Sequence, residues 1–493
     1  MKKVYLITIL LIMGLFLSSM AIADDHPLTL TTGDIQTLDP AFADTANDQM
    51  ILPNIYESLV TLDYDLNVVP VLAKSWDISE DGTVYTFHLR EDVKFHDGTQ
   101  FNAQAVKFSF DRVFFDPEAR LYRERKKIKE LKVIDDYTFQ VELEFPFPPF
   151  LKNLPFIVSP KAVEKYGEEF GSNPVGTGPF AFEEWVPADR LILKRNDNYW
   201  DGQTREERVV FRNIPESDTI VTELMLGNLD IAEVPKAYIE MMASKSHLRL
   251  VKKPGLNIRY IGINVTKEPW DDGRVRRAAN YAVDAKAIID NVHKGYGYVA
   301  KGPLPNAVWA HNPNLKLYEY NPEKAKELLA EAGYADGFKT DMIAWSSDTY
   351  LPLAKAVVGY WNEIGIDCKL RIFDWSTYLE VVNKEEKFDT FIFGYTGPVD
   401  PNDYLWDLFH SESDSNHSLY SKADELLDKA KVETNPEKRK EIYYEIQEKL
   451  VDAAPWVWLE NMEIDRIVNA RVKNYTIHPT GIKLLKDVYI EDK

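Results

Sequence analysis

The chain has 493 residues, with 79 Asp or Glu against 58 Lys or Arg, and this acidic balance argues against nucleic acid and anionic membranes as partners. A chain of this length is too long for one hydrophobic core, so two or three lobes are expected. The 11 Trp, 26 Tyr and 24 Phe exceed what cores usually require, which indicates that some aromatic side chains line a binding surface.

The first 23 residues have the pattern of a cleavable secretory signal peptide. Two lysines precede an apolar run from Val4 to Leu17, and Ala21-Ile22-Ala23 supplies the cleavage site. The run is shorter than the roughly 18 apolar residues of a membrane-spanning helix. Cys368, the only cysteine, is far from the cleavage point, so neither a lipid anchor there nor an intrachain disulfide is expected. These features predict a soluble, non-lipidated periplasmic protein.

The first half of the mature chain is predicted to contain a βαβ unit interrupted by a mixed α and β insert over residues 51–180. Strands are expected where apolar and polar residues alternate, and helices where apolar residues recur every three or four positions. The βαβ order of the later elements indicates parallel strands. The expected elements are strands at 28–32, 84–98 and 209–214, hairpins at 131–145 and 180–195, helices at 103–115 and 218–227, and a strand at 229–235.

The second half shows a cleaner alternation of strands and helices, which indicates a doubly wound α/β domain. Asn321-Pro322 begins a helix that Gly333 ends. The elements expected after it are strands at 340–345, 367–373 and 388–395, and helices at 350–364, 376–383, 421–432 and 436–452.

Two strands, 257–265 and 456–468, are predicted to cross between the two α/β units. A chain that leaves one lobe and returns gives two lobes on a double hinge with a cleft between them. The expected division is a signal peptide at 1–23, lobe one from 24–50, 181–256 and 468–493, an inserted subdomain at 51–180, and lobe two at 257–467.

The cleft walls are predicted from the rule that ligands of open α/β sheets lie beyond the carboxyl ends of the strands. In lobe two these ends carry aromatic rings for stacking and hydroxyls for hydrogen bonds. The alternative is that the rings only plug the end of the sheet. The candidate residues are Trp345, Ser346, Trp375, Tyr395 and Thr396 from lobe two, Tyr260 and Asn264 from the crossing strand, and Thr32 from lobe one.

The motif "NPVGTGPF" at 173–180 does not fit a phosphate-binding loop, because Pro179 follows Gly178 where a Walker loop has lysine. The sequence after it alternates as a strand, so it does not fit a dinucleotide fingerprint either. Its glycines permit a tight backbone, and we expect it to be the turn that closes the insert.

Signals for catalysis or for a metal are weak. The chain has no Gly-x-Ser-x-Gly and no His-Glu-x-x-His. A metal pair of His88 and His96 is less favoured than two polar strand residues, and the segment from His410 to His417 is better explained as a solvated loop. Acidic pairs are too numerous to single out or to exclude a glycosidase dyad. No metal or other cofactor is expected.

Several blocks of sequence, in order along the chain, resemble the family 5 extracellular solute-binding proteins that serve ABC importers. They include "AKSWDISEDGTVYTFHLREDVKFHDG", "SNPVGTGPFAFEEWVPADRLILKRNDNYWDG", "YNPEKAKELLAEAGY" and "YYEIQEKLVDAAPWVWL". The resemblance implies two α/β lobes with a subdomain inserted in the first, which close around a ligand and deliver it to the permease subunits in the inner membrane. It implies a monomer that catalyses nothing. It also adds Asp44 and Thr45 to the site.

The same resemblance makes a simple dipeptide doubtful as ligand. Dipeptide binders of the family hold the ligand's amine with an aspartate directly after Trp-Thr-Gly, whereas "GYTGPVDPNDY" has Pro398 there. They hold its carboxylate with an arginine at the end of strand 340–345, where this chain has Ala344 and Trp345. Longer peptides, oligosaccharides and metal chelates such as those of nickel remain open, and a secreted glycan hydrolase is less favoured. Asp400 and Asp403 are expected either to supply an acid to the cleft or to cap the turn beside them.

Overall fold

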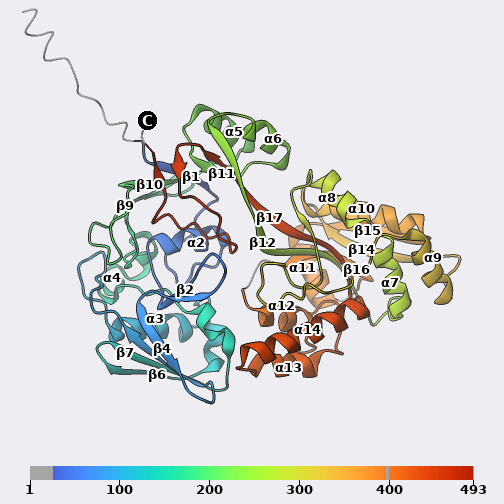
Figure 1. Cartoon of the computed structure of the whole chain (residues 1–493), viewed down its shortest axis with the longest axis horizontal. Helices are drawn as coiled ribbons and strands as arrows, with labels where there is room; N and C mark the ends of the chain where they lie inside the picture. Colours follow the sequence, from blue (N-terminus) through green and yellow to red (C-terminus); the bar gives the residue numbers. More distant parts are fainter. Residues whose placement is uncertain (1–25, 386, 396–398, 492–493) are drawn as a thin grey trace, which may run out of the picture.

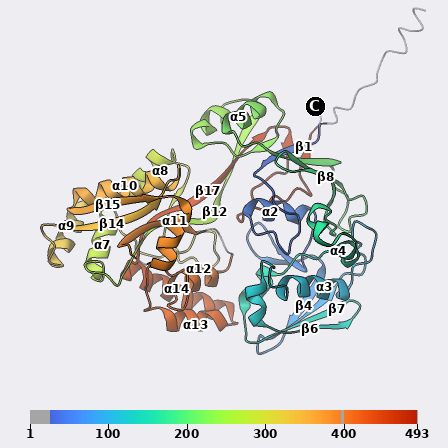
Figure 2. The same cartoon turned by 180° about the vertical axis from the view of Figure 1, so that it is seen from behind.

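The computed structural model describes residues 26–385, 387–395 and 399–491. Figures 1 and 2 show two lobes side by side, joined by β12 (Leu248–Ile263) and β17 (Trp456–Asn469). The predicted two-lobed α/β organisation with two crossing strands is confirmed. In the part of the chain that the structure describes, no helix is long and apolar enough to cross a membrane.

One sheet of eleven strands extends through both lobes, with β12 and β17 at its centre. These two strands pair antiparallel from Leu248↔Asn469 to Gly262↔Trp456. Because both strands belong to both lobes, a movement of one lobe against the other must bend this pair, which makes it the double hinge. The strands, in spatial order, are β15 (Ile366–Phe373), β14 (Phe338–Trp345), β16 (Thr390–Tyr395), β12, β17, β11 (Ile231–Ala232), β1 (Leu28–Thr32), β10 (Arg208–Asn213), β9 (Arg190–Arg195) and β8 (Phe180–Val186), with β13 (Tyr298–Val299) on β17.

Lobe two buries both faces of its part of the sheet. Val357 and Trp361 of α10 lie in the core on one face, and Leu405 and Tyr443 in the core on the other. Such two-sided burial is what parallel strands with crossover helices produce. The helices are α7 (Gly273–Tyr281), α8 (Ala285–Val292), α9 (Pro322–Glu331), α10 (Tyr350–Glu363), α11 (Trp375–Glu380), α12 (Pro401–Phe409), α13 (Asp424–Val432) and α14 (Pro436–Ala453).

The inserted segment has a hydrophobic core of its own around Phe87, Phe110 and Phe139. A four-stranded antiparallel sheet packs against α3 (Ala103–Phe114) to form it. The separate core supports the insert as a subdomain, while the exact boundaries of the insert and the lobes stay a prediction. The strands of this sheet, in spatial order, are β4 (Ala73–Ile78), β5 (Val84–Leu89), β7 (Thr138–Leu143) and β6 (Ile128–Asp135).

Short elements complete lobe one and link it to the insert. The hairpin β2–β3 and the C-terminal pair β18–β19 each form a two-stranded sheet. The elements are α2 (Ala46–Ile51), β2 (Val60–Leu62), β3 (Val68–Pro70), α4 (Pro160–Tyr166), α5 (Ser217–Leu226), α6 (Ile239–Ala243), β18 (Val472–Lys473) and β19 (Tyr489–Ile490).

The motif at 173–180 joins the insert to β8 through a close backbone approach. A Cβ added at Gly176 would lie 2.2 Å from the carbonyl oxygen of Ile55, and one at Gly178 would lie 2.7 Å from that of Asn54. Since no side chain fits these positions, the glycines allow the close contact with the segment at 54–55. The motif acts as the predicted closing connection.

Candidate ligand-binding site

The carboxyl ends of the lobe two strands bring five aromatic side chains together, and we call this set the aromatic platform. Trp345, the last residue of β14, lies 4.3 Å from Tyr350, 4.8 Å from Tyr378 and 4.9 Å from Trp375, between ring centroids. Phe393 of β16 completes the platform at 6.2 Å from Trp345. The structure therefore brings the predicted pair Trp345 and Trp375 together, whereas Tyr350, Tyr378 and Phe393 were not predicted.

Trp375 presents one ring of the platform to solvent. Its ring lies nearly parallel to Tyr378, at 12°, and to Phe393, at 24°, and its side chain remains 48% exposed. Asp374 fixes this position by capping α11, because its carboxylate accepts a hydrogen bond from the amide of Thr377 at 3.0 Å. An exposed ring backed by buried rings can stack on an apolar or flat part of a ligand.

Hydroxyl groups lie at the same strand ends. Tyr395, the last residue of β16, donates its hydroxyl to Asp407 at 3.0 Å. Ser346 is exposed directly after β14, and its amide is held by the carbonyl of Phe373 at 2.9 Å. Thr396, also predicted for the site, lies outside the described residues.

Asp400 is occupied by a structural role. Its carboxylate pairs with Arg439 at 2.7 Å and 3.0 Å and with Lys152 of the insert at 3.4 Å, and it caps α12 through the amide of Asn402. Burial opposes its ionisation, but Arg439 and Lys152 outweigh this effect and hold its pKa below the usual range. Of the two roles expected for Asp400, the structure shows the capping one.

Asp403, one turn along α12, differs from Asp400. Burial and the carboxylates of Asp400 and Asp407 raise its pKa. Its carboxylate accepts a hydrogen bond from the side-chain amide of Asn402 at 3.3 Å. This carboxylate is therefore the less satisfied of the two acids that the sequence singled out.

The crossing strand places its two candidates away from the platform's exposed ring. Tyr260 is 2% exposed and stacks on Trp456 at 3.4 Å and 7°, so it is a core residue. Asn264 accepts hydrogen bonds from Thr266 and is 1% exposed. Because β12 runs antiparallel to β16, with Ile263 opposite Thr390, Asn264 lies at the opposite end of β16 from Tyr395.

The lobe one candidates lie near the end of β1 and the start of α2. Thr32 is the last residue of β1. Asp44 is exposed, and Thr45 caps α2 by accepting a hydrogen bond from the amide of Asp48 at 3.2 Å. Lys483, which sequence reasoning missed, donates to the carbonyl of Thr31 at 2.7 Å. No hydrogen bond or ring contact joins these residues to the platform within the described chain.

The hinge strands carry polar groups that the sequence did not reveal. Glu460 of β17 pairs with Arg259 at 2.8 Å and with His293 at 3.0 Å, all three being buried. Both amide atoms of Asn461 and one oxygen of Glu463 are buried without a hydrogen-bond partner among the described residues. The alternating pattern of 456–468 predicted the strand, but pairing across more than 150 residues leaves no local signal.

The metal alternatives receive no support from geometry. His88 pairs with Asp77 at 2.8 Å, while His96 contacts the backbone of Gly178 at 3.0 Å. His410 stacks on Trp406, and His417 packs edge-on against Phe393. Over the described residues, no group of three or more His, Cys, Asp or Glu side chains is placed to hold a metal ion.

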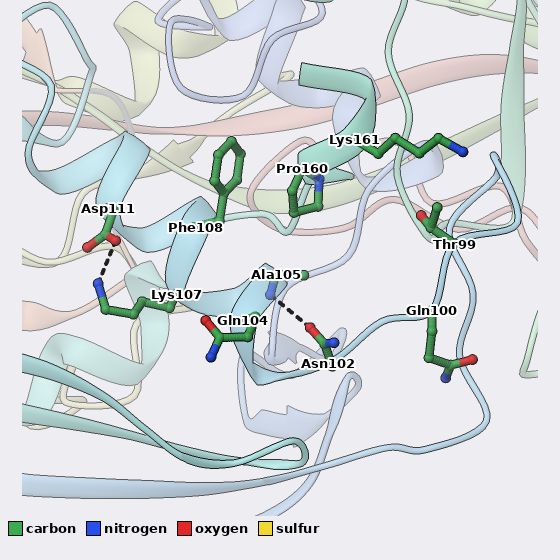
Figure 3. A pocket seen from close by; sticks show the side chains of 10 residues that line it. All are labelled: Thr99, Gln100, Asn102, Gln104, Ala105, Lys107, Phe108, Asp111, Pro160 and Lys161. Atoms are coloured by element: carbon green, nitrogen blue, oxygen red, sulfur yellow. Dashed lines mark hydrogen bonds and ion pairs between the residues drawn. The ribbon is translucent and has the colours of Figure 1, made fainter. Parts of the chain in front are cut away.

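A shallow depression of about 620 Å³ lies on the insert, between α3 and α4 (Figure 3). In the close-up, Lys107 reaches Asp111 at 2.6 Å, and Asn102 caps α3 through the amide of Ala105 at 3.0 Å. Lys107, Asp111 and Asn102 are thus engaged with α3, and the depression lies on the insert, away from the strand ends of lobe two.

Comparison with known proteins agrees with this architecture. Residues 67–417 match the family model of the bacterial extracellular solute-binding proteins, family 5 Middle. The chain belongs to this family. It is 34% identical to heme-binding protein A of Haemophilus influenzae, over 87% of this chain and 85% of that protein. It is also 34% identical to the dipeptide-binding protein of Escherichia coli K12, over 86% of each chain. The solved structure of HbpA2 from Haemophilus parasuis superimposes with a TM-score of 0.87 at 30% identity, covering 94% of this chain and 99% of that one.

Proposed function

We propose that this family member is the substrate-binding receptor of an ABC importer, which takes up a peptide-like or other small organic solute between its lobes and delivers it to the membrane permease. Family membership and the two-lobed fold on a double hinge support this proposal. Relatives at equal identity are named for haem and for a dipeptide, so similarity alone does not select the ligand. Binding energy, and no chemical step, drives closure of the lobes.

The finer features of the proposal come from the sequence. The signal peptide at 1–23 exports the protein to the periplasm, where it works as a monomer without a lipid anchor. The permease subunits of the inner membrane are its partners, and no nucleic acid takes part. The acidic surface charge is consistent with such a freely diffusing receptor.

The observation that carries the proposal is the exposed ring of Trp375 on the aromatic platform. β14 ends in Ala344 and Trp345, where dipeptide binders of the family have arginine. We place the ligand between the platform, with Ser346, Tyr395 and Thr396, and the lobe one residues Thr32, Asp44 and Thr45. Tyr260 and Asp400 support the site from within the fold, whereas Asn264, at the other end of β16, is too far along the strand to do so.

A second candidate ligand is an oligosaccharide, because an exposed tryptophan face with hydroxyls nearby suits a sugar ring. A metal chelate would bring its own ligands and needs no metal cluster in the protein. Glycan hydrolysis would need two carboxyl groups about 5 to 10 Å apart beside the bound sugar, and the platform itself contributes none.

The experiment is calorimetric titration of the mature protein with di-, tri- and pentapeptides, oligosaccharides and nickel chelates, repeated with Trp375→Ala. Loss of the stacking ring is expected to weaken binding of the best ligand by about 1–2 kcal/mol, roughly five- to thirtyfold. Phe115→Ala removes a similarly exposed ring from the insert, 40% exposed against 48%, and is expected to leave affinity unchanged. Equal affinities of wild type and Trp375→Ala would place the ligand elsewhere, and turnover of any oligosaccharide would refute the receptor proposal.

A further inference from the structure

Lobe one contains a cavity of about 390 Å³ that is separate from the aromatic platform. It is bounded by residues 49–71 with the β2–β3 hairpin, by residues 199–201, and by the C-terminal segment 482–488. All of its lining residues come from lobe one and the insert, and none from lobe two. A ligand could therefore bind here without closure of the lobes.

The walls of the cavity are mainly apolar. Aromatic side chains, among them Tyr64, Phe156 and Trp200, alternate around it with aliphatic ones such as Val71 and Leu484. A cavity of this size with apolar walls and a few polar groups has the character of a small-molecule site.

One polar group of the cavity is a carboxylate without a cation. Glu57 is 7% exposed and accepts hydrogen bonds from the hydroxyl of Tyr199 at 2.7 Å and from the indole nitrogen of Trp200 at 3.0 Å. Both donors are neutral, and in the described chain Glu57 forms no ion pair. The lining cation Lys486 is paired instead with Asp201. Burial raises the pKa of Glu57 to about 6, which leaves it mainly ionised at neutral pH.

A second polar group of the cavity lacks a partner. Ser58, next to Glu57, is 8% exposed, and its hydroxyl oxygen is buried with no hydrogen-bond partner among the described residues. Buried hydroxyls are nearly always hydrogen-bonded, because a buried hydroxyl without a partner has lost its hydrogen bonds to water and gained none in the protein. The cavity thus offers a negative charge and a free acceptor within an apolar wall.

We propose that this cavity is a second small-molecule site, which takes an organic ammonium with an apolar or aromatic body. The ammonium group lies against the Glu57 carboxylate and donates to the Ser58 hydroxyl, while the apolar body fills the aromatic part of the cavity. A cation supplies the positive counter-charge that the Glu57 carboxylate lacks. An ammonium group also has three hydrogen-bond donors for the acceptors present. The site is independent of the solute taken up between the lobes.

The test is titration of the full mature protein with 2-phenylethylamine, using 2-phenylethanol as the neutral probe of the same shape. The amine is expected to bind at least tenfold more tightly than the alcohol. Glu57→Gln, which keeps the side-chain shape, is expected to abolish that difference, and Glu164→Gln on the exposed face of α4 is expected to preserve it. Absence of amine binding, or equal binding of the two probes to wild type, overturns the proposal.

Two further variants locate the site should Glu57→Gln fail to fold. Thr61→Trp places a bulky ring at an exposed position on the cavity's edge and is expected to reduce amine binding at least tenfold. Trp375→Ala tests the other location, since amine binding that is lost in this variant and retained in Thr61→Trp belongs to the interlobe site and refutes the proposal.

Discussion

His96 holds the connection at 173–180 through its two ring nitrogens. Nε2 lies 3.0 Å from the carbonyl oxygen of Gly178, and Nδ1 accepts a hydrogen bond from the amide of Gly176 at 3.3 Å. This pattern requires a neutral ring with its proton on Nε2. Burial lowers the pKa of His96 to about 4, outweighing the hydrogen bond to Gly178 that favours protonation. A neutral histidine therefore fixes the junction between the insert and the main sheet.

His96 is expected to make the protein less stable in acid. Its folded pKa of about 4 lies below the unfolded value of 6.5, so the unfolded chain takes up a proton first as the pH falls. The free energy of unfolding should decrease from about pH 6.5 toward pH 4, by up to about 3 kcal/mol from this residue. Urea unfolding of wild type and His96→Gln at pH 7 and pH 4.5 measures this loss of stability. The variant should lose less, because glutamine cannot gain the proton. Equal losses of stability in both proteins would contradict the assignment.

The sequence predicted which candidate side chains lie together where the signal was local, while their role in binding stays a prediction. Trp345 and Trp375 were expected together because both follow strands of one parallel sheet, and the structure places their rings 4.9 Å apart. Asn264 was a candidate because it belongs to the crossing strand, but this strand is antiparallel to its neighbours, so its carboxyl end lies at the other edge of the sheet. The direction of that strand depends on pairing between distant segments, which a local pattern does not contain.

At the scale of elements, boundaries set by local sequence patterns were predictable and those set by partner strands were not. The strand predicted at 367–373 is observed as β15, and the helix predicted at 350–364 as α10, because their apolar spacing and flanking residues are local signals. The crossing strand was predicted to begin at 257 but begins at Leu248. Its first half contains Lys252, Lys253 and Pro254, which do not follow the pattern of a strand. This half is nevertheless a strand because it pairs with β17.

The start of α12 is stabilised by a buried ion pair with α14. Arg439 is 4% exposed and donates to both carboxylate oxygens of Asp400, which is 1% exposed. Removing Arg439 leaves the buried Asp400 carboxylate with Lys152, at 3.4 Å, as its remaining counter-charge, and breaking a buried pair in this way costs up to about 3–5 kcal/mol. We therefore expect Arg439→Met to destabilise lobe two by that amount.

Denaturant unfolding of three variants checks this expectation for α12. Arg439→Met combined with Asp400→Asn should recover more than about 1 kcal/mol, because asparagine carries no charge and can still cap the helix. Lys438→Met, at the exposed neighbouring position, should change the free energy of unfolding by less than about 0.5 kcal/mol. A double variant as unstable as Arg439→Met alone would show that the buried charge is not the cause.

At the scale of the molecule, the two lobes meet at a second place besides the hinge. Lys152, in the 3-10 helix Pro148–Asn153 of the insert, lies 3.4 Å from Asp400 and 5.5 Å from the ring of Trp309, both in lobe two. A Cβ at Gly82 of the insert would lie 2.6 Å from the methyl group of Thr434 in lobe two. The insert thus touches lobe two opposite the hinge. No sequence pattern predicts such a contact, because each partner forms its own secondary structure without the other.

Lys152→Met is expected to shift the protein toward an open arrangement of its lobes. The substitution keeps an unbranched side chain but removes the ion pair across the gap, while Asp400 keeps Arg439. A loss of about 1 kcal/mol from the closed state lowers its population about fivefold relative to the open state and weakens ligand affinity in proportion wherever the open state dominates. Small-angle X-ray scattering without ligand should then give a larger radius of gyration than wild type. Lys161→Met changes an exposed lysine of the insert and should match wild type in both the scattering and the affinity measurement. If Lys152→Met also matches wild type, the ion pair contributes nothing to closure.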